Sequence, residues 1–240
     1  TRMCGLAGIV DIKKLLNQEF LLRRLNKAYI YLRSRGPDDK GFWNDKNALF
    51  LHTRLKILDL KKTASQPMEY GNYVICYNGE IYNFKQIRKF LVNKGLRFKS
   101  SGDTEVLIAG WNYWGPEILK RLDGMFAFSI WDKQKKILYL VRDRYGIKPL
   151  YYAQWGQTLL FASEQKAILE IPSFVRCLNK DALLEYFTFQ NIFTNQTLTQ
   201  DIQMLPAGHF LVVDPSKVSP LSLHQFWDFN FLIFNYVSNS

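Results

Sequence analysis

The chain has 240 residues, of which 48% are hydrophobic and 15% are aromatic, enough for a full core without disulfide bonds. Its three cysteines are widely and irregularly spaced, a pattern that fits neither a disulfide framework nor a zinc site, and we expect no metal. The formal net charge is +11, but the lysines and arginines are scattered in pairs, which favours a solvated basic surface over a nucleic-acid-binding face.

The cellular compartment follows from what the sequence lacks. No apolar run reaches the roughly 18 residues that span a bilayer, and the first residues do not have the pattern of a signal peptide. Unpaired cysteines are typical of a reducing compartment. We therefore expect a cytoplasmic protein with no membrane and no nucleic acid among its partners.

A cysteine followed by a short apolar strand stands near the beginning of the sequence, at residues 4–11. If the residues before Cys4 are removed, Cys4 carries both a thiol and a free α-amine. Such an amine has a reference pKa of about 7.8 and can act as a general base toward its own thiol. The alternative interpretation is that Cys4 is a small buried residue of the strand.

The next segment predicts a helix from Asn17, a good N-cap residue, to about Leu32, because apolar residues recur there at helical spacing. The loop at residues 33–39 contains Gly-Pro and several charges, a composition that interrupts helices and strands. Its arginines and aspartates form either a surface turn or the rim of a polar pocket.

Two short strands are expected at residues 41–43 and 47–51, and they lead to His52 and Arg54. Arg54 is a candidate ligand for a substrate carboxylate, because the planar guanidinium group matches a carboxylate in a bidentate way. His52 is expected to be structural.

A predicted strand at residues 73–76 runs directly into Asn78 and Gly79. Asn-Gly is a strong hairpin signal, so a turn is one interpretation. The other is an oxyanion hole, in which the asparagine amide and the next backbone N–H both donate to a developing negative oxygen. A helix at residues 84–94 should follow, with Asn83 as its cap.

Asp103 precedes an apolar run that predicts a helix. It is either the cap of that helix or the partner of a substrate ammonium group. Residues 124–131 and 137–142 predict a β-hairpin, and the charged loop at residues 142–152 leads into a further strand. The remaining expected elements are strands at residues 158–162 and 210–213 and helices at residues 164–170 and 180–187.

The composition changes after Asp214, and residues 226–236 are rich in aromatic side chains with a single charge. This segment is too short to span a membrane. It is either a strand with a frayed end or part of a domain junction.

Nine stretches share their residues and their order with one family. They are Met3-Cys4-Gly5, Arg35-Gly36-Pro37-Asp38, Arg54 to Asp59, Asn78 to Asn83, Ser101 to Glu105, Asp123 to Phe128, Arg142 to Tyr151, Ala162-Ser163-Glu164 and Leu205 to Gly208. Together they resemble the glutamine-hydrolysing domain of asparagine synthetases, a class II glutamine amidotransferase domain with the N-terminal-nucleophile hydrolase fold. The resemblance implies a four-layer αββα sandwich of two antiparallel sheets.

The resemblance also implies roles for individual residues. Cys4 would be the nucleophile, with its own α-amine as base, and Asn78 with the Gly79 N–H would form the oxyanion hole. The implied glutamine-binding residues are Arg54, Leu55, Lys56, Ile57, Leu58, Asn78, Gly79, Glu80 and Asp103. Glutamine would be hydrolysed to glutamate and ammonia through a thioester. Thr1, Arg2 and Met3 would first have to be removed.

The same resemblance predicts how the chain is organised. We expect the glutaminase domain at residues 4–214, with residues 215–240 as a linker and the start of a synthetase domain that this sequence does not contain. Glutamine hydrolysis needs no cofactor, whereas ATP and Mg are expected only in the synthetase domain, which would dock at the C-terminal tail. Formation of a homodimer is left as a possibility.

Three other functions remain as hypotheses. The chain could belong to a class II amidotransferase with a sugar or another acid as acceptor. It could be a catalytically silent binding module that uses its aromatic tail. Nucleic-acid binding comes third.

Overall fold

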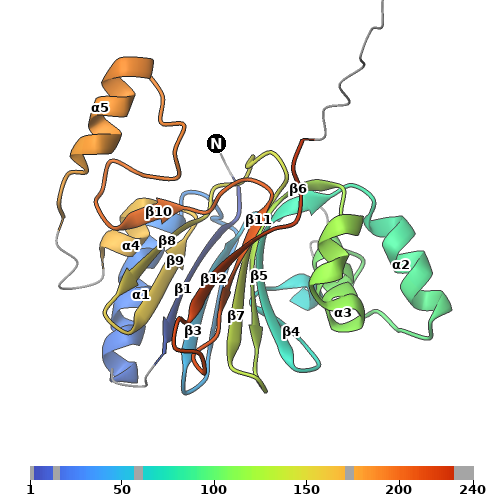
Figure 1. The fold of residues 1–240 in the computed structure, drawn as a ribbon. Coiled ribbons are helices and arrows are strands. Elements are labelled where there is room, and N and C mark those ends of the chain that lie inside the picture. Colours follow the sequence, from blue (N-terminus) through green and yellow to red (C-terminus); the bar gives the residue numbers. More distant parts are fainter. Residues whose placement is uncertain (1–2, 13–16, 57–61, 171–175, 230–240) are drawn as a thin grey trace, which may run out of the picture.

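The computed structural model describes residues 3–12, 17–56, 62–170 and 176–229 (Figure 1). Two six-stranded antiparallel sheets stack face to face, and helices cover both outer faces. The predicted four-layer αββα sandwich is confirmed. None of the helices in these ranges is long and apolar enough to cross a bilayer.

The first sheet has the strand order β10-β8-β9-β1-β3-β2. Its strands are β1 (Gly5–Asp11), β2 (Asp39–Asn44), β3 (Ala48–Arg54), β8 (Tyr151–Trp155), β9 (Thr158–Ala162) and β10 (Ile202–Met204). The second sheet has the order β12-β11-β7-β6-β5-β4. Its strands are β4 (Met68–Tyr70), β5 (Tyr73–Ile81), β6 (Gly124–Asp132), β7 (Ile137–Arg142), β11 (His209–Val213) and β12 (Leu221–Gln225).

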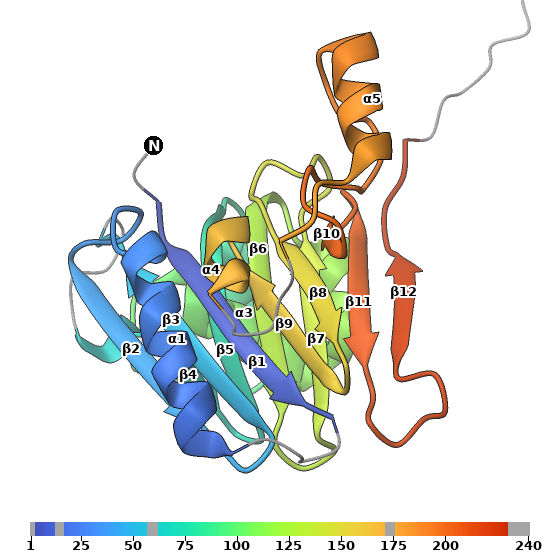
Figure 2. The same cartoon turned by 90° about the vertical axis from the view of Figure 1, so that its left-hand side faces the viewer.

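The helices are α1 (Gln18–Leu32), α2 (Phe84–Asn93), α3 (Asp103–Trp114), α4 (Gln165–Leu169) and α5 (Lys180–Phe189), with 3₁₀ turns at Lys62–Ala64 and Gly115–Arg121. Helices α1 and α4 cover the first sheet, and α2 and α3 cover the second. Helix α5 projects from the sandwich (Figure 2). The helices expected at residues 164–170 and 180–187 are confirmed as α4 and α5.

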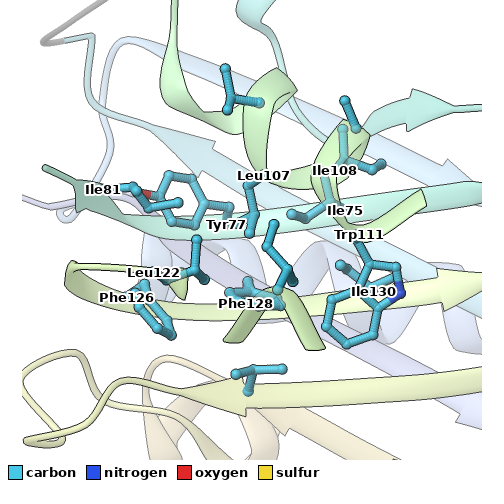
Figure 3. Close-up of a cluster of buried hydrophobic side chains, with 14 of the residues drawn as sticks. Ile75, Tyr77, Ile81, Leu107, Ile108, Trp111, Leu122, Phe126, Phe128 and Ile130 are labelled. Carbon is cyan, nitrogen blue, oxygen red and sulfur yellow. The ribbon is translucent and has the colours of Figure 1, made fainter. Parts of the chain in front are cut away.

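Three apolar layers hold these elements together. One lies between the sheets, one under α1 and α4, and one between the second sheet and α3, where Trp111 packs edge-on against Phe128 (Figure 3). Strand β1 is buried on both faces, because Leu6 and Val10 point into the layer between the sheets while Ile9 points toward the helices. A strand with two buried faces has a continuous apolar sequence, as residues 5–10 do.

Helix α1 forms as its sequence predicts. The side chain of Asn17 accepts a hydrogen bond from the Glu19 N–H at 2.8 Å, which is the expected N-cap contact. The apolar residues at helical spacing, from Leu21 to Leu32, are buried against the first sheet. Their burial fixes the position of α1 on the first sheet. The N–H of Met3 donates to the Arg35 carbonyl oxygen just beyond the helix, which holds the end of α1 close to Cys4.

Two expectations from local sequence are wrong. Asn78 and Gly79 do not form a hairpin turn: they lie inside β5, which pairs with β6 along its whole length. Asn83 precedes α2, but its side chain makes no cap contact with the helix. Its amide instead donates to the Arg121 carbonyl oxygen and accepts from the Asp123 N–H, because these loop groups would otherwise lack partners.

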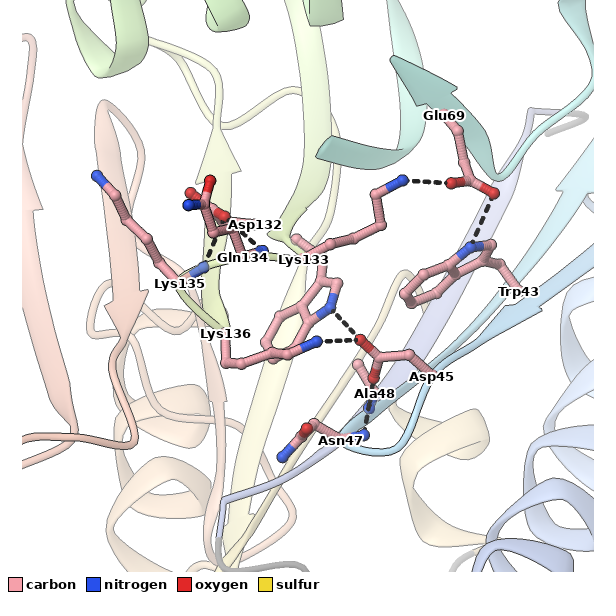
Figure 4. Close-up of polar contacts among 11 residues, drawn as sticks. Trp43, Asp45, Asn47, Ala48, Glu69, Asp132, Lys133, Gln134, Lys135 and Lys136 are labelled. Atoms are coloured by element: carbon pink, nitrogen blue, oxygen red, sulfur yellow. Dashed lines mark hydrogen bonds and ion pairs between the residues drawn. The ribbon is translucent and has the colours of Figure 1, made fainter. Parts of the chain in front are cut away.

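The sheets are also joined by polar contacts at the end where the β2–β3 and β6–β7 turns meet (Figure 4). Asp45 of the first turn accepts hydrogen bonds from the Trp131 indole N–H at 2.9 Å and from Lys136 Nζ at 3.1 Å. The hairpin of β6 and β7 is the predicted one. The turn of this hairpin follows the last residue of β6, whereas Met125 lies near the first residue of that strand.

The loop after β7 is organised by one buried carboxylate. Asp143 is fully buried and accepts hydrogen bonds from four backbone N–H groups, those of Phe126, Tyr145, Ile147 and Lys148. These bonds fold residues 143–148 into a compact turn and attach it to the start of β6.

Strand β12 lies beyond Asp214, where a linker was expected. It pairs with β11 and forms the outer edge of the second sheet (Figure 2). Of the aromatic tail, the structure describes residues 226–229, and there Trp227 and Phe229 both pack against Tyr145.

Replacing Asp143 with alanine should strongly destabilise the domain, because four N–H groups lose their acceptor and several of them are buried. We expect the free energy of unfolding to fall by about 3 kcal/mol or more, measured by urea denaturation. The matched control is Asp181→Ala on α5, an exposed aspartate, for which we expect a change within about 0.5 kcal/mol. Equal stability of the two variants would contradict this role of Asp143.

Candidate active site

Cys4 lies immediately before β1 and is half-buried. The N–H of Leu55, just after β3, donates to its sulfur at 3.4 Å, and Arg35 Nε donates to its carbonyl oxygen at 3.1 Å. Burial raises the pKa of the Cys4 thiol, while the Leu55 N–H and the charge of Arg54 act in the opposite direction. The thiol is therefore held in place but needs a base to become a nucleophile.

The thiol opens into a cavity at the end of the two sheets. Seven of the predicted site residues line this cavity: Cys4, Arg54, Leu55, Asn78, Gly79, Glu80 and Asp103. Lys56 is not among the lining residues; its N–H donates to Asp38. Ile57 and Leu58 lie outside the described residues. The fold thus brings together the residue that precedes β1 and residues from β3, β5 and α3.

Asn78 presents an unpaired donor to the cavity. Its side chain is 2% exposed, and its Nδ2 has no hydrogen-bond partner among the described residues. A buried N–H without a partner is destabilising by about 1–3 kcal/mol, so such groups are rare unless they serve a ligand. The position of Asn78 therefore suits an oxyanion that is present only during a reaction.

The N–H of Gly79 points to the edge of β5 that faces away from β6. Successive N–H groups of a strand alternate in direction, and the N–H groups of Tyr77 and Ile81 donate away from β6, to Gln66 Oε1 at 2.6 Å and to Asp103 Oδ2 at 3.1 Å. Gly79 lies between them. A Cβ atom at this position would come within 2.3 Å of the Met125 carbonyl oxygen, so only glycine fits without a shift of β6.

Asp103 is the first residue of α3 and lines the cavity, whereas the N-cap position belongs to Gly102, so the interpretation of Asp103 as the cap is wrong. The Tyr77 hydroxyl donates to its carboxylate at 2.6 Å, and the Ile81 N–H donates to the same oxygen. Burial raises the pKa of Asp103, and these two hydrogen bonds oppose that shift. A cationic group of a ligand would complete the environment of this carboxylate.

Arg54 supplies the opposite charge. It ends β3, is 6% exposed, and lines the same cavity as Asp103. A small ligand that carries one anionic and one cationic group, such as an amino acid, is complementary to this pair. Glu80 adds a second carboxylate to the lining.

His52 supports the structure rather than the chemistry. Its ring is fully buried, Nε2 lies 2.9 Å from the Tyr77 carbonyl oxygen, and the ring is not part of the cavity lining. Burial lowers the pKa of His52 to about 4, so the ring is neutral at pH 7. The two other cysteines are also outside the lining: Cys76 is buried and Cys177 is exposed.

Sequence analysis missed several residues that line the cavity, chief among them Gln66, Tyr77, Thr104, Met125 and Lys148. Tyr77 adjoins the Asn-Gly pair, and Lys148 belongs to the charged loop, so both carried a signal. Gln66 carried none. In the part of the chain that the structure describes, no group of three or more histidine, cysteine, aspartate or glutamate side chains is placed to hold a metal ion.

Comparisons with known proteins agree with this geometry. Residues 3–227 match the family model described as a glutamine amidotransferase domain. Two glutamine-hydrolyzing asparagine synthetases of Bacillus subtilis, numbers 1 and 3, are 35% and 39% identical over 218 and 189 residues, which is 89% and 77% of this chain. The matches cover 34% and 30% of those relatives, so the chain spans about a third of their length.

Solved structures show the same fold. The glutamine phosphoribosylpyrophosphate amidotransferase from B. subtilis matches with a TM-score of 0.61 at 18% identity, over 93% of this chain and 49% of that chain. A structure of the allosteric regulatory enzyme of purine biosynthesis matches with a TM-score of 0.63 over the same shares. At this identity the likeness concerns the fold alone.

Proposed function

Since the chain belongs to the glutamine amidotransferase domain family, we propose that its cavity binds glutamine and that Cys4 releases the side-chain nitrogen as ammonia. One observation supports this proposal more strongly than the others. The Nδ2 atom of Asn78, which has no hydrogen-bond partner among the described residues, and the thiol of Cys4 belong to residues that line one cavity, together with one buried arginine and one buried aspartate.

Glutamine fits the charges of the cavity. Arg54 binds its α-carboxylate through the fork of the guanidinium group, and Asp103 binds its α-ammonium group. Tyr77 and the Ile81 N–H keep the Asp103 carboxylate fixed. With both ends of the amino acid held, the side-chain amide is directed toward the thiol and the oxyanion hole.

The reaction then proceeds in two stages, with Cys4 as the first residue of the chain. The thiol proton moves to the α-amine of Cys4, and the thiolate attacks the amide carbon. Asn78 Nδ2 and the Gly79 N–H bind the resulting oxyanion. When the C–N bond breaks, the nitrogen takes the proton from the α-ammonium group and leaves as ammonia.

The second stage restores the enzyme. The α-amine takes a proton from water, and the hydroxide attacks the thioester in the same oxyanion hole. The C–S bond breaks, the sulfur regains its proton, and glutamate leaves. This cycle requires a free amine on Cys4, because the nitrogen of a peptide bond has no basic lone pair.

The names of the relatives suggest the fate of the ammonia. We infer that it serves the ATP-dependent amidation of aspartate in a synthetase domain, with ATP and Mg bound there and not in the cavity described above. Glutamine hydrolysis itself uses only side chains, the α-amine of Cys4, backbone N–H groups and water.

Cys4→Ala should abolish glutamine hydrolysis, because it removes the atom that forms the thioester. We expect a loss of at least about 10³-fold in kcat, measured as ammonia or glutamate release from protein that begins at residue 4. The control is Cys177→Ala, which removes an exposed cysteine far from the chemistry and should leave the rate unchanged. Similar activity in the Cys4 variant would refute the proposal.

Asn78→Ala and Arg54→Lys should differ in their kinetics. Asn78 acts in the transition state, so its loss should lower kcat by about 10² to 10³ with little change in KM. Arg54 binds the carboxylate in the ground state as well, so losing the bidentate fork should raise KM about tenfold or more. Steady-state kinetics with folding checked by circular dichroism measures both. If the two signatures were exchanged, the assigned roles would be wrong.

A further inference from the structure

Lys148 is a buried cation that the proposed reaction leaves unused. It lies in the loop between β7 and β8, is 7% exposed, and lines the same cavity as Cys4. Its N–H donates to Asp143 at 3.0 Å, and its carbonyl oxygen accepts from Arg142 Nε at 2.9 Å. A buried aspartate and a half-buried arginine therefore fix the main chain from which this side chain enters the cavity.

The side chain ends beside the segment that precedes β1. Lys148 Nζ lies 3.2 Å from the Met3 sulfur, and the described residues include no ion-pair partner for it. Burial lowers the pKa of Lys148, and the charge of Arg35 adds to this, while Asp143, Cys4 and Glu80 oppose it. Because Met3 precedes Cys4 directly and both line one cavity with Lys148, this ammonium group belongs to the surroundings of the α-amine that removal of Met3 would free.

Four other charged residues lie around Cys4, and they belong to different elements of the fold. Arg35 follows α1 and is paired with Glu164 at 2.5 Å. Arg54 lies at the end of β3, and Asp103 begins α3 with its carboxylate bonded to the Tyr77 hydroxyl. Glu80 lies on β5. Lys148 is thus a cation whose charge is not offset by a direct ion pair within the described residues.

We propose that Lys148 is a positioning residue for the proposed reaction: its ammonium group disfavours a second positive charge on the α-amine of Cys4, so that this amine is a free base at neutral pH. The inference rests on the proposed role of Cys4 as an N-terminal nucleophile. An α-amine with its reference pKa of about 7.8 is mostly protonated at pH 7 and cannot accept the thiol proton. A neighbouring cation lowers that pKa and increases the competent fraction.

The sign of the effect determines the test. Removing the cation raises the pKa of the amine, so activity is lost at neutral pH and regained at higher pH. Lys148→Met removes the charge with little change in shape, and Lys148→Arg keeps it. The matched control is Lys135→Met, which removes the same charge from the exposed β6–β7 turn (Figure 4). This turn lies at the end of β6 opposite to Met125, which lines the cavity.

All variants begin at residue 4, and kcat/KM for glutamine is measured from about pH 5.5 to pH 9. In Lys148→Met, the acid limb of the pH profile, where kcat/KM falls as the pH decreases, should move to higher pH by about half a unit to one unit. At high pH the rate of the variant should approach that of the parent protein. Lys148→Arg and Lys135→Met should keep the limb of the parent. Thermal unfolding of each variant shows that the fold is intact.

A second readout does not need turnover. The α-amine of residue 4 is acetylated with acetic anhydride in a Cys4→Ala background, because the thiol would otherwise be acetylated first and pass its acetyl group to the amine. The pH dependence of this acetylation, followed by mass spectrometry, reports the pKa of the amine. We expect the same upward shift in Lys148→Met and no shift in Lys135→Met.

The proposal is overturned if the limb and the amine titration of Lys148→Met coincide with those of the parent, or if both methionine variants shift equally. A loss of rate that is uniform across pH would also overturn it. Failure of the proposed function looks different: the parent protein would not hydrolyse glutamine at any pH, while the amine titration would still report on Lys148.

Discussion

The pairing of β5 with β6 is the constraint on which the rest of the site depends. Because this pairing is continuous, Asn78 and Gly79 sit in a rigid strand with their donors directed into the cavity. A flexible turn at the same place would let the amide find a partner or water. The strand instead keeps Nδ2 of Asn78 buried and without a partner among the described residues, which is costly in the resting protein and useful when an oxyanion forms.

The stacking of the two sheets supplies the second part of the site. Cys4 enters from the first sheet, where β1 is buried along its whole length, while Asn78 belongs to the second sheet. Strands β1 and β5 contact each other across the apolar layer between the sheets. The core therefore sets how the strand that follows Cys4 lies relative to the strand that carries the oxyanion hole.

Much of this could be predicted from the sequence, where the signal is local. The cap and apolar face of α1 and the β6–β7 hairpin follow from short-range chemistry. The Asn-Gly pair shows the limit, since its local turn preference is overridden by pairing with β6, a partner about 50 residues away. Lys148 reaches the cavity and the Met3 sulfur only because Asp143 folds the loop that carries it, and no pattern in the sequence predicts that contact.

The most direct test of the account is whether catalysis needs the free amine of Cys4. Two preparations of the chain would be compared, one that begins at residue 4 and one in which Met3 is retained, with the N-terminus of each verified by intact mass. Glutamine hydrolysis by the first preparation and a loss of at least about 10²-fold in the second is the predicted result. Equal rates in the two preparations would contradict the account and require a base other than the amine of Cys4.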